Sequence, residues 1–210
     1  DKQPYKSEVL VAVDGSPDQT LTWVSRAALW RPYINVLDNR VNRGKGFAVR
    51  RGMLSAHGRL LLFTDADLPT PIEGVGPLMK ALEDGSDVAI GSRELPESDV
   101  RAPQAWWHGF MRFTFNRVSR LTTLLGIRDA RCPFKLFPRA VALNIFPRQC
   151  LGQFCFDVEV LWIARKLGYR IAEVPTVWAN HPVNKIRPIA DYAWMFLDLG
   201  RIRVNDWRDV

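Results

Sequence analysis

Short apolar runs alternate with segments of helical periodicity along the first half of the chain. The runs are bounded by polar or turn-forming residues, as buried strands are, and cover Glu8–Val13, Tyr33–Leu37, Arg59–Phe63 and Asp87–Gly91. The segments of helical spacing between them cover Thr20–Trp30, Gly44–Ala56 and Ile72–Leu82. This order predicts an α/β fold in which a mostly parallel sheet is flanked by helices.

The second half of the chain has a different pattern. Beyond residue 100 the sequence is helical and aromatic, with a helix expected over Val158–Leu167 and one late strand over Arg170–Val174. The chain has 210 residues, no repeats and no low-complexity linker, which predicts a single domain over residues 1–210. A doubly wound sheet normally has another strand–helix unit before Glu8, so we expect this sequence to lack the first unit.

Two carboxylates follow the third apolar run directly. If Asp65 and Asp67 continue the extended backbone of Arg59–Phe63, their side chains point to one side, because the period of a strand is two. They would then lie at the carboxyl end of a strand, where open α/β sheets bind ligands, and would suit Mg²⁺ or Mn²⁺ carrying a diphosphate. The alternative is a polar turn in which Asp67 caps the helix after Pro71.

Two further loops could contact a nucleotide. Asp14 follows the first predicted strand and could accept the imide N–H of a uracil, or it could form a turn that caps the next helix. The segment NRGKG at residues 42–46 opens a helix, where Lys45, the two glycines and the helix N-terminus would favour a phosphate. Basic helix starts are also common on solvent-exposed faces, so both interpretations stay open.

The charge balance favours anionic partners. Lys and Arg total 29 against 22 Asp and Glu, a net charge of +7, which fits nucleic acid, phosphorylated small molecules or an acidic membrane surface. The sequence has no zinc-finger spacing and no long basic block, so no nucleic-acid partner is expected. No uncharged apolar run is long enough to span a bilayer. The three cysteines lack CxxC spacing, which indicates reduced thiols of a cytoplasmic protein.

A series of short motifs occurs in a specific order along the chain. They are DGSPDQT at residues 14–20, NRGKG at 42–46, TDAD at 64–67, GSR at 91–93, GIRD at 126–129, CPFKLF at 132–137 and FDVE at 156–159. Together they resemble the family-2 glycosyltransferases of GT-A fold, in particular the dolichyl-phosphate β-glucosyltransferases and related polyprenyl-phosphate sugar transferases. The resemblance spans residues 8–200. It implies a GT-A (nucleotide-diphospho-sugar transferase) fold with a nucleotide-sugar-binding half over residues 8–100 and an acceptor- and membrane-facing half over 101–210.

The resemblance also implies roles for individual residues. Asp14 would contact the uracil of a nucleotide-sugar donor, and Lys45 would lie near the nucleotide. Asp65 and Asp67 would form a DXD motif that holds Mg²⁺ or Mn²⁺, with Asp67 as the direct ligand. The donor diphosphate and the acceptor phosphate would be bound by Arg93, Arg128, Arg131 and Lys135. The sugar side of the site would be lined by Asp129 and Asp157, which form the implied catalytic set with Arg93.

The implied reaction moves a hexose, glucose from UDP-glucose, to a polyprenyl or dolichyl phosphate. Such a phosphate is largely ionised at neutral pH, because its second pKa is about 6, and so needs no strong general base. One-step displacement would invert the anomeric centre. Asp157 could orient the acceptor or a sugar hydroxyl, or it could simply be the N-cap of the helix Val158–Leu167.

Two aromatic segments predict contact with a membrane surface. Residues 104–125 contain Trp106, Trp107 and other aromatic residues together with several arginines, a composition typical of a helix that lies in the bilayer interface. Aromatic residues at helical spacing also form cores, so this alternative stays open. The segment Pro188–Val204 has the same character. With a net charge of +7, both segments favour peripheral association with an anionic leaflet on the cytoplasmic face, where a lipid acceptor would be met.

Two alternatives to this function stay open. GDP-mannose could replace UDP-glucose as the donor of a polyprenyl-phosphate mannosyltransferase. The chain could also be a non-catalytic nucleotide-sugar or membrane-surface binding module, because the first strand–helix unit is absent and Val13 stands where the family usually has an acid.

Overall fold

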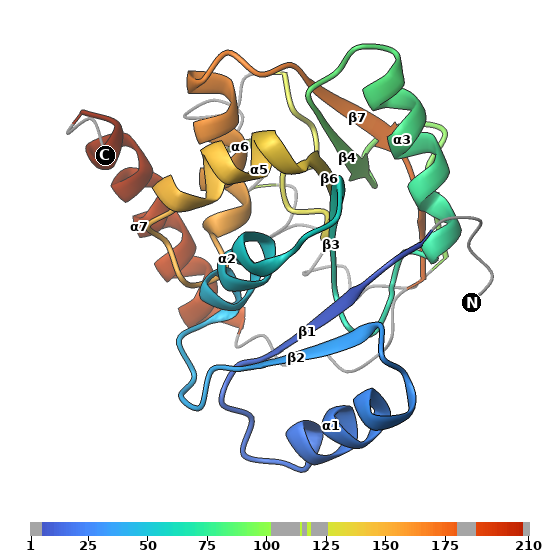
Figure 1. Cartoon of the computed structure of the whole chain (residues 1–210). Coiled ribbons are helices and arrows are strands. Elements are labelled where there is room, and N and C mark those ends of the chain that lie inside the picture. The colour runs from blue at the N-terminus through green and yellow to red at the C-terminus, as the bar shows by residue number, and fades with distance from the viewer. Residues whose placement is uncertain (1–5, 102–113, 115–116, 119–125, 180–187, 208–210) are drawn as a thin grey trace.

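The central element of the molecule is a four-stranded sheet (Figure 1). The computed structural model describes residues 6–101, 114, 117–118, 126–179 and 188–207. The strands lie in the order β3, β6, β4, β7 and cover Leu60–Thr64, Phe134–Pro138, Val88–Ser92 and Ile171–Pro175. β4 and β7 run parallel, whereas β6 runs antiparallel to both β3 and β4. The sheet is therefore mixed, with one reversed strand inside it.

Two smaller sheets accompany the central one in the described part of the chain. β1 (Val9–Val13) pairs in parallel with β2 (Ile34–Asp38). β5 (Asp99–Val100) pairs in parallel with β8 (Val177–Trp178). Most of the described strand pairs are thus parallel, as the alternation of strand and helix patterns predicts.

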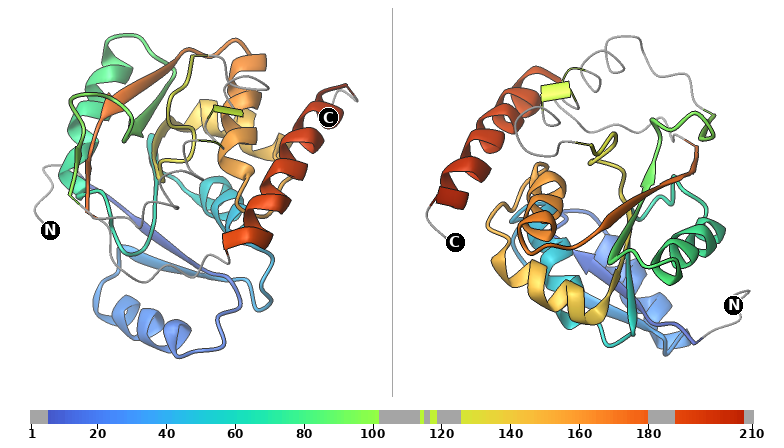
Figure 2. Two further views of the ribbon diagram at one scale, coloured as in Figure 1. Left: turned by 180° about the vertical axis from the view of Figure 1, so that it is seen from behind. Right: turned by 90° about the horizontal axis from the view of Figure 1, so that it is seen from above.

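Helices cover both faces of the central sheet, as Figures 1 and 2 show. One face carries α2 (Lys45–Ser55), α5 (Arg139–Ile145) with the 3₁₀ turn η2 (Phe146–Arg148), and α6 (Phe156–Lys166). The other face carries α3 (Val75–Glu83), which follows the 3₁₀ turn η1 (Ile72–Gly74). α1 (Thr20–Trp30) packs on the β1–β2 pair and has no fully buried residue.

The last helix, α7 (Pro188–Trp207), lies on the outside of α6 (Figure 2). Its side chains Met195, Leu199 and Ile202 are buried in the same apolar cluster as residues of α6. The guanidinium of Arg203 also lies 5.1 Å from the centre of the Trp162 ring on α6. None of the described helices has the length and apolar character needed to cross a membrane.

Alternation along β6 separates two apolar clusters. Phe134 and Leu136 face α3 and pack with Leu78, whereas Phe137 belongs to the cluster beneath α5 and α6. Lys135 must point to the same side as Phe137, because the period of a strand is two. Its side chain is buried, with 1% of the residue exposed, so a charged group enters the apolar layer under α6.

Most predicted elements are confirmed to within one or two residues, but β6 is not predicted by the pattern. Lys135 interrupts its apolar run and proline stands at both ends, so neither the length nor the period indicates a strand. Apart from residues 114, 117 and 118, the segment 104–125 lies outside the described residues. The interfacial helix expected there stays a prediction.

Candidate active site

The segments that follow β3 and β4 and the segment that precedes β6 lie at the same end of the central sheet, called the sheet edge below. Thr64 at the carboxyl end of β3 lies opposite Phe134 at the amino end of β6, and Ile90 of β4 lies opposite Lys135. The residues that follow β3 and β4 are therefore brought beside the residues that precede β6. Those segments hold most of the candidate site residues, and their arrangement places the site at the carboxyl ends of β3 and β4.

Asp65 and Asp67 lie in a tight turn, which corrects the expectation of an extended backbone. β3 ends at Thr64, and the N–H of Leu68 donates to the carbonyl of Asp65 at 3.1 Å. Leu68 has a φ of 46°, in the left-handed region. The turn leaves Asp67 exposed and Asp65 half-buried. The alternative role of Asp67 as a helix cap is wrong, because Pro71 precedes η1 and no side chain caps it.

Lys45 supplies a cation to this turn. Its Nζ lies 2.6 Å from Asp65 Oδ1 and 5.6 Å from the centre of the Phe63 ring. A cation therefore already contacts Asp65, and the exposed Asp67 adds a second carboxylate at the same turn, so these oxygens fit Mg²⁺ or Mn²⁺. The described residues contain no cluster of three or more His, Cys, Asp or Glu that could hold a metal.

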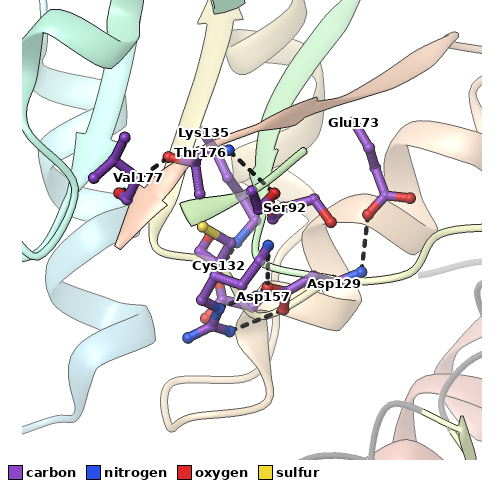
Figure 3. A network of polar contacts seen from close by, with 10 residues as sticks. Ser92, Asp129, Cys132, Lys135, Asp157, Glu173, Thr176 and Val177 are labelled. Carbon is purple, nitrogen blue, oxygen red and sulfur yellow. Dashed lines mark hydrogen bonds and ion pairs between the residues drawn. The ribbon is translucent and has the colours of Figure 1, made fainter. Parts of the chain in front are cut away.

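A second ion pair lies deeper, under the amino end of α6. The Nζ of Lys135 donates to Asp157 Oδ1 and, at 2.7 Å, to the carbonyl of Cys132. Figure 3 shows Asp157 and Lys135 within one network that also contains Asp129. Burial raises the pKa of the Asp157 carboxyl above its ordinary value, although the Lys135 ammonium acts in the opposite direction. The N-cap alternative for Asp157 is wrong, because Cys155 occupies that position and no side chain caps α6.

Arg93 and Asp129 form a third pair at the same edge. Arg93 donates from Nε and Nη2 to the two carboxylate oxygens of Asp129, at 2.6 and 2.8 Å, and its guanidinium lies 4.6 Å from the centre of the Trp178 ring. Asp129 is fully buried. Burial alone would raise the pKa of this carboxyl, but the charge and hydrogen bonds of Arg93 outweigh it and set it at about 2. The pair is therefore charged and fixed, and direct contact of Asp129 with a sugar stays a prediction.

The remaining basic candidates differ in accessibility. Arg128 is exposed, and its side chain makes no ion pair with any described residue, so its guanidinium is available to a phosphate. Arg131 is half-buried and interacts with other residues of the chain. Lys135 is occupied by Asp157, so its contact with a substrate phosphate stays a prediction.

Asp14 organises the loop that leads into α2. Its carboxylate accepts hydrogen bonds from the backbone N–H groups of Arg43 at 3.1 Å and Gly44 at 2.7 Å, and from the side chain of Asn39 at 3.0 Å. It does not cap α1, whose N-cap is Gln19, so that alternative is wrong. A contact with uracil stays a prediction, which would use the remaining acceptor capacity of the carboxylate.

The glycines of the NRGKG motif serve close packing within the protein. A Cβ on Gly44, which has a φ of 99°, would lie 2.4 Å from the carbonyl oxygen of Gly152. A Cβ on Gly46 would lie 2.6 Å from the carbonyl oxygen of Leu151. The N–H of Phe47 also donates to the Gly152 carbonyl at 3.1 Å. The start of α2 is thus locked against the loop that precedes α6, and the two halves of the chain meet there.

Two glutamates, the half-buried Glu173 and the buried Glu159, hold loops near the candidate site and were not among the candidates. Glu173 of β7 accepts hydrogen bonds from the backbone N–H groups of Arg128 and Asp129, at 2.8 and 2.9 Å, and so holds the turn that carries both residues. Glu159 of α6 accepts from the N–H groups of Cys150 and Leu151, at 3.1 and 2.8 Å. The sequence feature that could have identified them is a carboxylate within an otherwise apolar strand or helix face. Such a carboxylate needs a hydrogen-bond partner when it is removed from water.

Comparisons with known proteins agree with this architecture. The model of the family described as Glycosyl transferase family 2 matches residues 1–146. The dolichyl-phosphate beta-glucosyltransferases of Dictyostelium discoideum and Drosophila melanogaster are 34% and 36% identical over 95% and 97% of this chain. The chain spans 63% and 64% of the length of those two relatives.

Solved structures give the same fold at lower identity. Mannosyl-3-phosphoglycerate synthase from Rubrobacter xylanophilus matches with a TM-score of 0.69 and 15% identity, over 99% of this chain and 66% of that one. Glucosyl-3-phosphoglycerate synthase from Mycobacterium tuberculosis, in complex with UDP, matches with a TM-score of 0.66 and 17% identity, over 92% of this chain and 68% of that one. Both support the GT-A fold. The chain belongs to glycosyl transferase family 2.

Proposed function

We propose that this chain carries the catalytic site of an inverting glycosyltransferase that moves glucose from UDP-glucose to dolichyl phosphate or a related polyprenyl phosphate. The names of the relatives support the donor sugar and the acceptor, because proteins named dolichyl-phosphate beta-glucosyltransferase are 31–36% identical over nearly the whole chain. Their names also specify a β linkage. That linkage follows from an α-linked donor if a single displacement inverts the anomeric centre.

The observation that carries the proposal is the charge arrangement at the sheet edge. The Lys45 ammonium contacts the Asp65–Asp67 turn, and the exposed Arg128 lies in the segment that precedes β6, whose amino end pairs with the carboxyl end of β3. Carboxylates for a divalent ion next to cations for phosphate are what a nucleotide diphosphate requires. A purely structural salt-bridge network would not leave Asp67 and Arg128 exposed and without an ion partner among the described residues.

In this proposal Asp65 and Asp67 would hold Mg²⁺ or Mn²⁺. When bound, the ion would neutralise the negative charge that develops on the departing nucleotide diphosphate. Arg128 binds a phosphate of the donor or the acceptor through its exposed guanidinium. The Arg93–Asp129 pair fixes the segment after β4 against the segment before β6, and both this pair and the Lys135–Asp157 pair are neutral overall.

We also propose that the protein is peripheral on the cytoplasmic face of a membrane, where the lipid acceptor is met. α7 presents Trp194 and Leu197 to the outside, both 58% exposed, and Arg201 lies one turn after Leu197. Exposed tryptophan beside arginine is typical of side chains at a membrane interface. The free cysteines Cys132, Cys150 and Cys155 agree with a reducing compartment.

The test is a transfer assay with UDP-glucose and GDP-mannose, a short polyprenyl phosphate, and Mn²⁺ or Mg²⁺ either present or chelated. We expect metal-dependent glucose transfer from UDP-glucose. Asp67→Asn should abolish that transfer while leaving the melting temperature nearly unchanged, because Asp67 is exposed and fills no core space.

Glu73→Gln is the matched control, because it neutralises an exposed carboxylate in the next turn of the chain and should retain full activity. Transfer from GDP-mannose alone would identify a mannosyl donor instead. Nucleotide-sugar binding with no turnover of either donor would indicate a binding module. Metal-dependent turnover in Asp67→Asn equal to that of the unmodified protein would refute the assignment of Asp67.

A further inference from the structure

The backbone of Lys45 is held firmly from both sides. Gly44 before it is bound by Asp14 and packed against Gly152, and Gly46 after it is packed against Leu151. The Cα of Lys45 therefore has little freedom to shift. Its four-carbon side chain is flexible, so its ammonium can move while its origin stays fixed.

The contact of this ammonium with Asp65 has the character of an exchangeable pair. Lys45 Nζ to Asp65 Oδ1 and Arg93 Nε to Asp129 Oδ2 are both 2.6 Å, but the burial of the two pairs differs. The side chains of Lys45 and Asp65 are 32% and 28% exposed, against 9% and 0% for Arg93 and Asp129. A single, partly solvated ion pair is weak, whereas a buried pair with two hydrogen bonds is permanent.

The charges around the Lys45 ammonium favour a cation at its position. Both Lys45 and Asp65 act electrostatically on the buried Asp157, the first favouring and the second opposing its charge. The Lys45 and Lys135 ammonium groups lie 5.6 and 5.7 Å from the centre of the Phe63 ring. Lys45 therefore supplies positive charge to two carboxylates, Asp65 by direct contact and Asp157 at longer range.

We propose that Lys45 is an exchangeable internal counterion of Asp65. Its ammonium holds the carboxylate while the donor site is empty, and a divalent cation competes with it for the same oxygen. Once released from Asp65, the Lys45 ammonium becomes available to the phosphates of the donor. The inference rests on the proposed function, because it takes Asp65 as part of the metal site.

The direct test is Mn²⁺ affinity without any nucleotide, measured by electron paramagnetic resonance of free Mn²⁺ or by calorimetry. Lys45→Gln removes the competing charge and keeps a side chain of similar length, so Mn²⁺ should bind about three- to tenfold more tightly. Lys45→Arg keeps the charge and should stay close to the unmodified protein. A gain of affinity is an effect that loss of structure would not produce.

Two controls confine the effect to this pair. Lys80→Gln removes an exposed lysine whose partner is Asp84 and should leave Mn²⁺ affinity unchanged. In an Asp65→Asn background, Lys45→Gln should produce no further gain, because the oxygen for which the two cations compete has lost its charge. With UDP-glucose as donor, Lys45→Gln should nevertheless lower the turnover number, because the ammonium would also be missing from the donor phosphates.

Each outcome decides the inference. If Lys45→Gln binds Mn²⁺ no more tightly than the unmodified protein, while the unmodified protein transfers sugar in a metal-dependent way, the counterion role is wrong and the proposed function stands. If neither protein binds Mn²⁺ and neither is active, both are wrong. Equal gains in Lys45→Gln and Lys80→Gln would show a general charge effect and would also overturn the role of Lys45.

Discussion

Three ion pairs at one sheet edge differ in burial, and burial decides what each can do. Lys45–Asp65 is partly exposed, Lys135–Asp157 is buried under α6, and Arg93–Asp129 is buried and held by two hydrogen bonds. A charged side chain that is buried away from water needs a partner of opposite charge. Removing one partner leaves the other buried and unpaired, which is destabilising. The two buried pairs therefore support the site by staying intact, while the exposed groups remain free to bind substrate.

The Arg93–Asp129 pair predicts a specific loss of stability in acid. The folded-state pKa of Asp129 is about 2, below its ordinary value of 3.8, so its stabilising contribution is complete above about pH 4 and is lost as the pH falls toward 2. The shift corresponds to roughly 2 kcal/mol. Urea unfolding of the unmodified protein and of Asp129→Asn should show a stability difference that shrinks by about this amount between pH 5 and pH 2.5.

Asp129→Asn lacks the titrating carboxyl, so the comparison cancels the effect of the other acidic groups. The variant should be less stable than the unmodified protein at pH 6, because the Arg93 guanidinium loses the charge of its partner in a buried position. A stability difference that stays constant from pH 5 to pH 2.5 would contradict the assigned charge state of Asp129.

At the scale of elements, the contact between the start of α2 and the loop before α6 joins the two halves of the chain. Gly44, Gly46 and Gly152 allow backbones to approach more closely than any side chain would permit. The loop before α6 is itself held by Glu159. Because Lys45 begins α2 and Asp157 lies in the first turn of α6, this contact sets the distance between two charges of the site.

Gly44→Ala tests this contact. The substitution forces a left-handed φ of 99° on a residue with a side chain and puts its Cβ 2.4 Å from the Gly152 oxygen, so we expect a loss of at least about 2 kcal/mol in the free energy of unfolding. Turnover should fall as well, because Lys45 would shift with the backbone. Urea titration and the transfer assay measure the two effects.

Gly52→Ala is the matched control on the same helix. A Cβ there meets nothing within 4 Å, so alanine should stabilise α2 by about 0.5–1 kcal/mol through its higher helix propensity. Equal stability of Gly44→Ala and Gly52→Ala would show that the close approach to Gly152 has no energetic importance.

At the scale of the whole molecule, α7 has one buried and one exposed apolar face. Met195, Leu199 and Ile202 bind it to the core, whereas Trp194, Leu197 and Val204 face outward, each at least 50% exposed. A hollow on this outer side is lined by residues from successive turns of α7, namely Leu197, Gly200, Arg201, Val204 and Asn205. An apolar stripe beside arginines is suited to the interface of an anionic bilayer.

Membrane attachment through α7 predicts that the double variant Trp194→Ser, Leu197→Ser co-sediments less with vesicles containing anionic lipid. Turnover with a long-chain polyprenyl phosphate should fall in parallel, while UDP-glucose affinity should stay unchanged, because the sheet edge is untouched. Trp30→Ser on α1 is the control, since Trp30 is 85% exposed on a different helix. Undiminished vesicle binding by the double variant would place the membrane contact on another surface.

Much of the secondary structure and part of the site could be read from the sequence. Thr20–Trp30 is predicted to the residue, and the strand before Asp65 is displaced by one position. β6 was not predicted because its second residue is a lysine, Lys135, whose burial depends on Asp157. The turn at Asp65–Leu68 was predicted only as the alternative to an extended backbone, and no glycine marks the left-handed Leu68.

Local periodicity and motif order by themselves determined the α/β class, the position of most elements and the residue types at the site, because these depend on neighbours along the chain. Only the tertiary structure decided which charges are paired and which are free. Lys135 and Asp157 are 22 positions apart, and Arg93 and Asp129 are 36 positions apart. Whether a charged side chain binds a ligand or another side chain is set by burial and by contacts across the sheet, which a local pattern does not contain.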